Sequence, residues 1–506
     1  MTAGAQAEIE VKFRTTVEGM AAVLASPVFK SPTAVHVLRS VYYDTADHRL
    51  FGQHMVLRLR FRDGASPVQS LKSSAGPGRN FCRREIEVPV PGGFPDLTAF
   101  TPDVAADIQA LIGGRPLEPQ FETAVTRRVF LLTGGRSLIE AACDAGDIVA
   151  AQGREPLLEL ELELKTGDDG DLFELAGKLG ASLPLMLDFT SKSQRGFALV
   201  RGERPRAVKA YAMALQRGAT LDDAVRLTLT ASLDHFAANW LALRDRGDPE
   251  ALHQLRVALR RMRSALAIFG DMLPVPRFRL LRMEAKRIAR GLGPAREWDV
   301  FMATFETVMP AGGEVPDGLD QLRKAAEARR GEAHRAALAL LSHRGTTLFV
   351  LTVEAILARR YWRDAVKGAP ARRLSSPATG PARKGLDRLW RRVLKRGRNF
   401  ADLGDKERHA LRIALKDMRY GSEIFAGVLG TTSRMKRAVT FQAMLGDRND
   451  LVVARRLVKD LTAAAPGAFD RCAGLLLARI AARHHAGERA LRDTWKKLKR
   501  AKPFWR

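Results

Sequence analysis

Cysteine is scarce in this chain of 506 residues, and its three cysteines, Cys82, Cys143 and Cys472, are an odd number without the spacing of metal ligands. We therefore expect no disulfide framework and a reducing compartment. Long apolar runs are also missing: the best candidate, residues 473–482, is interrupted by Arg479, so we expect no membrane insertion. Since the sequence begins without a signal-peptide pattern, the prediction is a cytoplasmic protein.

Acidic residues are sparse only in the second part of the chain. Residues 1–200 contain 21 Lys and Arg against 25 Asp and Glu, whereas residues 201–506 contain 62 against 31, and the net charge is +27. The length is sufficient for two or three hydrophobic cores. We expect the basic part to attract a polyanion: nucleic acid, polyphosphate or an anionic membrane surface.

Charged and apolar residues alternate strictly at residues 8–13, with the period of two of a β-strand. Glu8, Glu10 and Lys12 therefore point to one side of this strand, and the apolar residues point to the other. The pattern returns at residues 159–165. Because an ordinary solvated strand face carries mixed polar residues, a face of charged groups alone indicates the lining of a polar barrel interior.

Other strands of residues 1–200 alternate in the same way, with Arg58 and Arg60 on one face and Glu85 and Glu87 on another. A buried charge needs a partner or an ion. A closed antiparallel barrel gathers such faces and leaves no open sheet edge. Its cations would hold phosphate oxygens and its carboxylates Mg²⁺ or Mn²⁺, which is the arrangement of metal-assisted phosphoryl transfer.

Nearly all of residues 1–200 resembles the CYTH domain, also called the triphosphate tunnel metalloenzyme fold. The segments that carry the resemblance are Glu8-x-Glu10-x-Lys12, Tyr42-Tyr43-Asp44-Thr45, Leu57-Arg58-Leu59-Arg60, Leu71-Lys72, Arg84-Glu85-x-Glu87, Thr126-Arg127-Arg128, Cys143-Asp144-x-Gly146, Glu159-x-Glu161-x-Glu163 and Ser191-Lys192-x-x-Arg195-Gly196. The resemblance implies an eight-stranded tunnel that binds a linear triphosphate with two metal ions. Members of this family include inorganic triphosphatases, thiamine triphosphatases, adenylate cyclases and RNA triphosphatases.

The resemblance assigns the site residues to three sets. The phosphate-binding set is Lys12, Arg58, Arg60, Lys72, Arg127 and Lys192, and strand parity leaves Arg128 open as the alternative to Arg127. The metal ligands are Glu8, Glu10, Glu159, Glu161 and Glu163. The catalytic set is Lys12, Glu85, Glu87 and Asp144.

The second part of the chain contains an internal repeat. From about Leu221 it reads as helices, and a loop is expected at residues 365–384. His253, Arg256, Arg260, Arg263 and Phe269 recur at a spacing of 156 residues as His409, Arg412, Lys416, Arg419 and Phe425. A second matching block contains Gly293 and Gly446. We predict a domain at residues 1–200, a linker at 201–214 and a helical domain at 215–500, whose repeats cover about 215–365 and 385–500.

Each repeat places its histidine and its cations on one stripe of a helix. Like charges one turn apart repel, so a cationic stripe implies a compensating anion. This half resembles the CHAD domain, a conserved-histidine helical module, which implies two four-helix bundles and a basic groove that binds inorganic polyphosphate. Lys416 keeps the charge of Arg260 but loses its bidentate geometry.

The predicted protein is therefore a multidomain α+β enzyme, with a closed antiparallel eight-stranded β-barrel and all-α duplicated four-helix bundles. We expect it to hydrolyse inorganic triphosphate with Mg²⁺ or Mn²⁺, two ions, and to bind inorganic polyphosphate, in the cytoplasm or on polyphosphate granules. One alternative is a polyphosphate-targeting protein with little or no catalysis. Others are a nucleotide or thiamine triphosphatase and an adenylate cyclase. Specific nucleic-acid binding is not expected, because no base-reading motif is present.

Overall fold

The structure is a computed structural model that describes residues 6–74, 81–211, 213, 215–309, 317–430, 435–503 and 505. The chain divides into two compact units. The first contains Met1–Arg206 and Ser342–Arg359, and the second contains Ala207–Leu341 and Arg360–Arg506.

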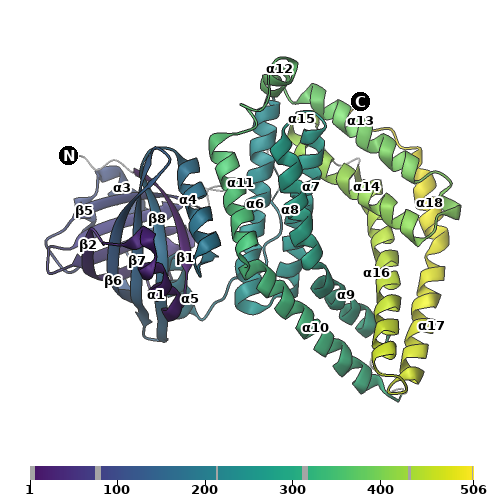
Figure 1. Cartoon of the computed structure of the whole chain (residues 1–506), viewed down its shortest axis with the longest axis horizontal. Coiled ribbons are helices and arrows are strands. Elements are labelled where there is room, and N and C mark those ends of the chain that lie inside the picture. The colour runs from purple at the N-terminus through teal and green to yellow at the C-terminus, as the bar shows by residue number, and fades with distance from the viewer. Residues whose placement is uncertain are drawn as a thin grey trace. The chain divides into compact units, whose positions relative to one another are not determined.

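Antiparallel strands close the first unit into an eight-stranded barrel, which confirms the predicted fold (Figure 1). The closing strand β1 pairs with β5 through Gln6–Ile9 and with β8 through Glu10–Arg14. The short strand β9 adds to β1 outside the closed ring. The strands are β1 (Gln6–Arg14), β2 (Ala34–Asp44), β3 (Met55–Arg62), β4 (Val68–Ser74), β5 (Cys82–Pro89), β6 (Glu118–Gly134), β7 (Ser137–Ala150), β8 (Gly153–Thr166) and β9 (Met186–Asp188).

Apolar residues of the strands face outward and pack under helices, because successive side chains point to opposite faces of a strand. On β3, Leu57 and Leu59 are fully buried in a cluster with Ile108 and Ile112, while Arg58 and Arg60 point to the interior. The helices of this unit are α1 (Val17–Ala25), α2 (Arg49–Gly52), α3 (Pro102–Ile112), α4 (Asp169–Ser182), α5 (Lys192–Arg201) and α11 (Arg344–Arg359). Short 3₁₀ turns cover Pro27–Phe29 and Leu97–Ala99.

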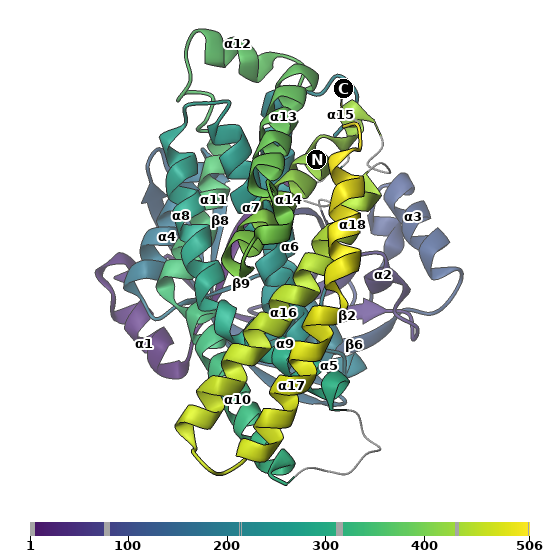
Figure 2. The ribbon, with the colours of Figure 1, turned by 90° about the vertical axis from the view of Figure 1, so that its right-hand side faces the viewer.

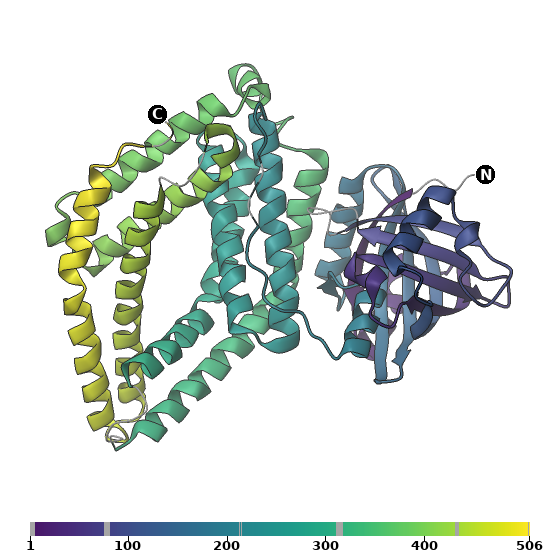
Figure 3. The same cartoon turned by 180° about the vertical axis from the view of Figure 1, so that it is seen from behind.

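The second unit is helical, as predicted. Helices α6, α7 and α8 follow one another side by side (Figure 3), and α16 packs against α17 (Figure 2). One apolar core contains Phe301, Phe305, Val458 and Leu476. The helices are α6 (Leu221–Arg246), α7 (Pro249–Gly270), α8 (Pro276–Gly291), α9 (Gly293–Val308), α10 (Leu319–Ser342), α12 (Ala369–Ser375), α13 (Thr379–Arg396), α14 (Asp405–Ile424), α15 (Ala426–Leu429), α16 (Lys436–Ala464), α17 (Asp470–Ala486) and α18 (Glu488–Lys499), with a 3₁₀ turn at Phe400–Asp402.

The loop predicted at residues 365–384 is wrong in part, because α12 and the first turn of α13 lie within it. Pro370 occupies the first turn of α12, and Pro381 lies in the first turn of α13. Proline is tolerated in a first turn, where its missing N–H would have no helical partner. Pro370 and Pro381 therefore mark helix starts within the expected loop.

Length and apolar composition decide whether a helix can span a membrane, and the consecutive helices α10 and α11 are the relevant pair. Among the described residues, no single helix is long and apolar enough to cross a bilayer. Taken together, α10 and α11 meet that test of length and composition, with a bend of 50° between them.

Candidate functional site: a charged tunnel and a cationic groove

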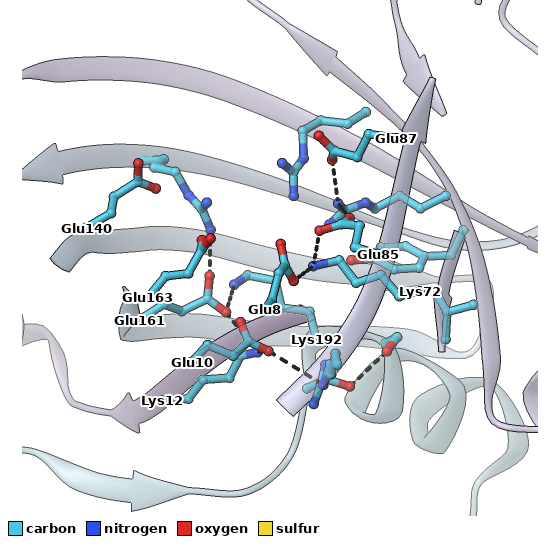
Figure 4. A pocket seen from close by; sticks show the side chains of 18 of the residues that line it. Glu8, Glu10, Lys12, Lys72, Glu85, Glu87, Glu140, Glu161, Glu163 and Lys192 are labelled. Atoms are coloured by element: carbon cyan, nitrogen blue, oxygen red, sulfur yellow. Dashed lines mark hydrogen bonds and ion pairs between the residues drawn. The ribbon is translucent and has the colours of Figure 1, made fainter. Parts of the chain in front are cut away.

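The polar strand faces meet in one cavity of about 170 Å³ (Figure 4). Cations and carboxylates alternate around it because the strand register pairs them, Lys12 with Glu161 and Lys72 with Glu85. The predicted residues that line it are Glu8, Glu10, Lys12, Arg58, Arg60, Lys72, Glu85, Glu87, Arg127, Glu161, Glu163 and Lys192. The two remaining predicted residues, Asp144 and Glu159, are buried beside this lining and bonded to it.

Asp144, Glu159 and Glu161 form a cluster that could hold a metal ion. One carboxylate oxygen from each residue lies within 4.8 Å of the others. Asp144 on β7 pairs in register with Glu159 on β8, and Glu161 is on the same face of β8. Three carboxylates suit a hard divalent cation such as Mg²⁺ or Mn²⁺. Asp144, which was predicted as catalytic, thus lies with two predicted metal ligands.

Two cations hold this acidic cluster together. Lys192 Nζ lies 2.9 Å from Asp144 Oδ2 and 2.9 Å from Glu161 Oε1, and it also pairs with Glu159. Arg127 donates two hydrogen bonds to Asp144, of 2.8 and 2.7 Å, and one of 2.7 Å to Glu161. The cluster therefore combines three carboxyl groups that could hold a metal ion with two cations.

The pKa values in this cluster follow from burial and from these ion pairs. Burial opposes the charged form of Lys192, but Asp144, Glu159 and Glu161 raise its pKa above the ordinary lysine value. Burial also opposes ionisation of Glu161, yet Lys192, Lys12 and Arg127 hold its pKa well below the usual range. Glu159 differs, because burial raises its pKa more than Lys192 lowers it.

A second cluster surrounds Glu85. Arg58 Nη2 lies 2.9 Å from one oxygen of Glu85, and Lys72 Nζ lies 2.8 Å from the other. Lys72 also lies 2.9 Å from Glu8. Burial and the neighbouring Glu85 raise the pKa of Glu8 to about 7, so this carboxyl is close to half protonated at neutral pH.

Arg60 is the cation of the lining with the least compensation. Burial, together with the nearby Arg58 and Arg127, lowers its pKa to about 10. Its Nε is buried and has no hydrogen-bond partner among the residues that the structure describes. A buried guanidinium in this state favours an incoming anion.

The structure places Arg127 in the cavity, and Arg128 is not part of the lining. The lining also contains Tyr42, Arg83, Glu140, Lys165, Ser191 and Ser193, which were not predicted as site residues. Strand parity could have indicated Arg83 and Lys165, because they share faces with Glu85 and Glu163. Glu140 had no comparable signal, since no alternating charges surround it.

In the second unit, the two repeats bring their cationic stripes together at the contact of α7 with α14. Arg260 Nε donates to Tyr420 Oη at 2.9 Å, and Ser264 Oγ bonds Asp417 at 2.6 Å. The glycine of each second block lies beside the arginine of its own repeat. A Cβ on Gly293 would lie 3.5 Å from Arg256, and one on Gly446 would lie 3.7 Å from Arg412.

The contact of α7 with α14 brings cations of both repeats close together. Burial and the adjacent Arg260 and Arg412 lower the pKa of Lys416 to about 6. Burial and Arg296 lower the pKa of His253 to about 4. The Nε atoms of Arg263 and Arg412 are buried without a hydrogen-bond partner among the described residues. We call this set of residues the cationic groove, after the basic groove that the resemblance to the CHAD domain implies; its members are His253, Arg256, Arg260, Arg263, Arg412 and Lys416.

Two predicted residues are oriented differently from the rest of the stripes. His409 is exposed, and its Nδ1 lies 2.6 Å from the side-chain oxygen of Asn449. Arg419 donates to Glu423 at 2.8 Å. The stripe on α14 therefore contributes Arg412 and Lys416 to the groove, and its ends have other partners.

Comparisons with known proteins divide the chain in the same way. Residues 6–197 match the family model of the CYTH domain, and residues 227–459 match that of the CHAD domain. An uncharacterized protein of Mycobacterium tuberculosis is 28% identical over 489 residues, which are 88% of this chain and 86% of that protein. An inorganic triphosphatase of Haemophilus influenzae is 31% identical over 171 residues, or 32% of this chain and 46% of that protein. The crystal structure of the CHAD domain from Ricinus communis is 30% identical, with a TM-score of 0.49, and covers 58% of this chain and 97% of its own.

Proposed function

The chain joins a CYTH domain at residues 6–197 to a CHAD domain at residues 227–459, and we propose that it hydrolyses inorganic triphosphate in the tunnel with a divalent metal. We further propose that the cationic groove binds inorganic polyphosphate. The similarity of the N-terminal part to an inorganic triphosphatase supports the first proposal.

One observation carries the proposal for the tunnel. Its cavity contains both the cations that a triphosphate anion needs and the carboxylates that a metal ion needs. A site that only bound an anion would be weakened by so many carboxylates, because like charges repel at short range. A substrate that arrives with a metal ion satisfies both sets of groups.

The donor set fits a divalent metal, with Asp144, Glu159 and Glu161 as the residues that would hold it. Glu8, Glu10 and Glu163 are the other predicted ligands that line the cavity. A bound Mg²⁺ or Mn²⁺ would neutralise phosphate charge and polarise the phosphorus–oxygen bonds. A second ion, which the family resemblance implies, would find Glu8 and Glu85 near Lys72.

The chain's own residues would bind and orient the substrate. Arg58, Arg60 and Lys72 would hold one end of a linear triphosphate, and Lys12, Arg127 and Lys192 the other end. Asp144 fixes Arg127 and Lys192, and Glu85 fixes Arg58 and Lys72, so these carboxylates position cations. Glu87 is half exposed and its Oε1 lies 3.7 Å from Arg58; in this proposal it would orient an attacking water and accept its proton.

The cationic groove has a different composition. The Nε atoms of Arg263 and Arg412 are buried without a hydrogen-bond partner among the residues that the structure describes, and burial raises the pKa of the neighbouring Asp450. A linear polyanion with closely spaced phosphates would compensate these charges. The ring centre of Tyr420 lies 5.5 Å from the Arg260 guanidinium, but the ring is buried, so it is not exposed for stacking on a base.

The test is phosphate release by the full-length chain from inorganic triphosphate, thiamine triphosphate and ATP, with Mg²⁺, with Mn²⁺ or with EDTA. We expect metal-dependent release that is fastest from inorganic triphosphate and lost in EDTA. The variant Lys12→Met should be inactive, and the matched control Arg128→Ala should be active. Release from no substrate would overturn the enzyme proposal, and cyclic AMP formation from ATP would replace it by a cyclase.

A further inference from the structure

Helix α11 comes from the middle of the helical half of the sequence, yet it packs against α4 in the tunnel unit (Figure 1). Thr347, near the beginning of α11, lies beside Gly180, near the end of α4. Arg359, the last residue of α11, bonds Asp168, which caps the beginning of α4. The two helices are therefore antiparallel, which is also the favourable arrangement of their dipoles.

Glycines on α4 allow this close packing. A Cβ on Gly177 would lie 3.3 Å from Leu348 Cδ1, and one on Gly180 would lie 3.0 Å from Thr347 Cγ2. At Gly170 a Cβ would lie 2.4 Å from Arg359 Nε. Glycine within a helix is unfavourable relative to alanine, so three glycines on the face that meets α11 need a compensating contact. Helix α11 supplies that contact.

An ion cluster fixes the other end of the helix pair. Arg359 donates to Asp168 and Glu174, each at 2.6 Å, and also bonds Asp171. Asp171 in turn accepts a hydrogen bond of 2.7 Å from Ser137, the first residue of β7. One guanidinium from α11 therefore ties α4 to the strand that carries Asp144.

On the side of α4 that faces the barrel, Gly180 contacts Phe13 of β1, the strand that carries Lys12 of the cavity. Phe13 is fully buried, and its ring lies as close to Gly180 as Thr347 does, with 3.0 Å from Phe13 Cε1 to a Cβ at that position. Phe13 follows Lys12 on β1, so Phe13 points outward where Lys12 points into the tunnel. Helix α11 also contacts β9, which pairs with Lys12–Arg14 of β1.

We propose that α11 is a positioning element of the tunnel: with α4 and β9 it braces β1 so that Glu10 and Lys12 face the cavity. Arg359 is the residue through which this brace is held. The catalytic unit would then include residues 342–359 in addition to the first 206, and the helical half would contribute directly to the tunnel.

Hydrogen exchange of the full-length chain tests this proposal without requiring activity. In Arg359→Glu, we expect amide exchange in α4 and at residues 11–14 of β1 to become at least tenfold faster, while β3 and β4 exchange as in the wild type. Arg359→Lys should restore most of the protection. Arg344→Glu is the matched control, because Arg344 is exposed on the same helix and the charge change is the same.

If Arg359→Glu does not fold, Arg359→Gln should give a smaller change in the same segments. Unchanged exchange in the Arg359 variants, or equal acceleration across the whole barrel, would overturn the brace. Where the chain turns over triphosphate, Arg359→Glu should raise KM at least fivefold with kcat within twofold. An inactive wild-type chain would count against the proposed function alone, since the exchange result stands independently.

Discussion

Polyphosphate binding to the cationic groove should weaken as the pH rises above 6, because Lys416 is mostly neutral in the empty groove. The charged groups that act on Lys416 include Arg260, Arg412 and Arg256, which lower its pKa, and Asp450, which raises it; the His253 side chain also interacts with Lys416. Burial and the arginines lower the pKa of Lys416 to about 6 from an ordinary value of 10.5. A bound polyanion would favour the ammonium form, so binding near pH 7 takes up a proton.

The size of the effect follows from the pKa. With a pKa of about 6, the charged fraction of Lys416 falls from about one half at pH 6 to roughly one hundredth at pH 8. If the complex requires the ammonium, the affinity falls roughly 50-fold over this interval, or about 1.4 kcal/mol per pH unit at the upper end. His253, whose pKa is lowered to about 4 by burial and Arg296, can add a further dependence.

The assay is fluorescence anisotropy of labelled polyphosphate with the full-length chain at pH 6, 7 and 8, at constant ionic strength, because the affinity depends on salt. Lys416→Arg keeps the charge at all three pH values and should reduce the slope of log Kd against pH by about one unit. Lys395→Arg, at an exposed position on α13, should leave the slope unchanged. Equal slopes for the wild type and Lys416→Arg would refute the reasoning.

The same group affects the stability of the empty chain. Between pH 6 and 10.5 the unfolded chain holds a proton on Lys416 that the folded chain lacks, so the contribution of this residue to stability rises with pH. Lys416→Met should therefore raise the melting temperature most near pH 6 and below. With saturating polyphosphate, the wild type should instead have a higher melting temperature than Lys416→Met.

Three further predictions concern the tunnel, the groove and the barrel. Lys12→Met and Glu161→Gln should each lower kcat/KM for triphosphate by about 100-fold or more and leave polyphosphate affinity unchanged, and normal turnover would contradict the assigned tunnel. Arg256→Ala combined with Arg412→Ala should weaken polyphosphate binding by about tenfold or more without loss of turnover, and an unchanged Kd would point to another surface. Gly146→Ala should lower the free energy of unfolding by about 2 kcal/mol or more, because its Cβ would lie 2.0 Å from Ala124 O, whereas Gly474→Ala, with open space around it, should not, as thermal melts of both would show.

The residues that line the tunnel could be predicted from the sequence because alternate residues of each barrel strand face the interior. Once alternating charges fix the inward face of β1, Lys12 and Glu10 must lie in the interior, and the same holds for Arg58 on β3. Parity could not separate Arg127 from Arg128, since Thr126 and Val129 beside them do not distinguish the two faces. The register of β6 against β7, which pairs Arg127 with Asp144, makes that distinction.

The helical half was less predictable because helix packing depends on contacts far apart in the sequence. The repeat gave the stripes, but it did not show that Lys416 would lie partly buried among arginines of both repeats. It also placed residues 344–359 in the first helical repeat, whereas α11 packs against α4. The glycines of α4 were the local signal of a close neighbour, and only the structure identifies that neighbour.

The tunnel and the cationic groove differ in how their charged side chains are paired. Because of this difference, we expect the two sites to select different ligands. In the tunnel, Lys192, Arg127, Lys72 and Arg58 are each paired with carboxylates before any ligand arrives. A bare anion would have to break these pairs and face the freed carboxylates, whereas an anion accompanied by a metal ion lets every group exchange one partner for another.

In the cationic groove, Arg263 and Arg412 retain buried nitrogens without hydrogen-bond partners among the described residues, and burial together with the neighbouring arginines lowers the pKa of Lys416 to about 6. A polyanion without bound metal supplies the negative charge that these cations lack. A metal ion bound to the polyanion would reduce its negative charge and therefore weaken its binding. Added Mg²⁺ should therefore promote triphosphate turnover while weakening polyphosphate binding. If Mg²⁺ strengthened both, the charge compensation described for the two sites could not explain their selectivity.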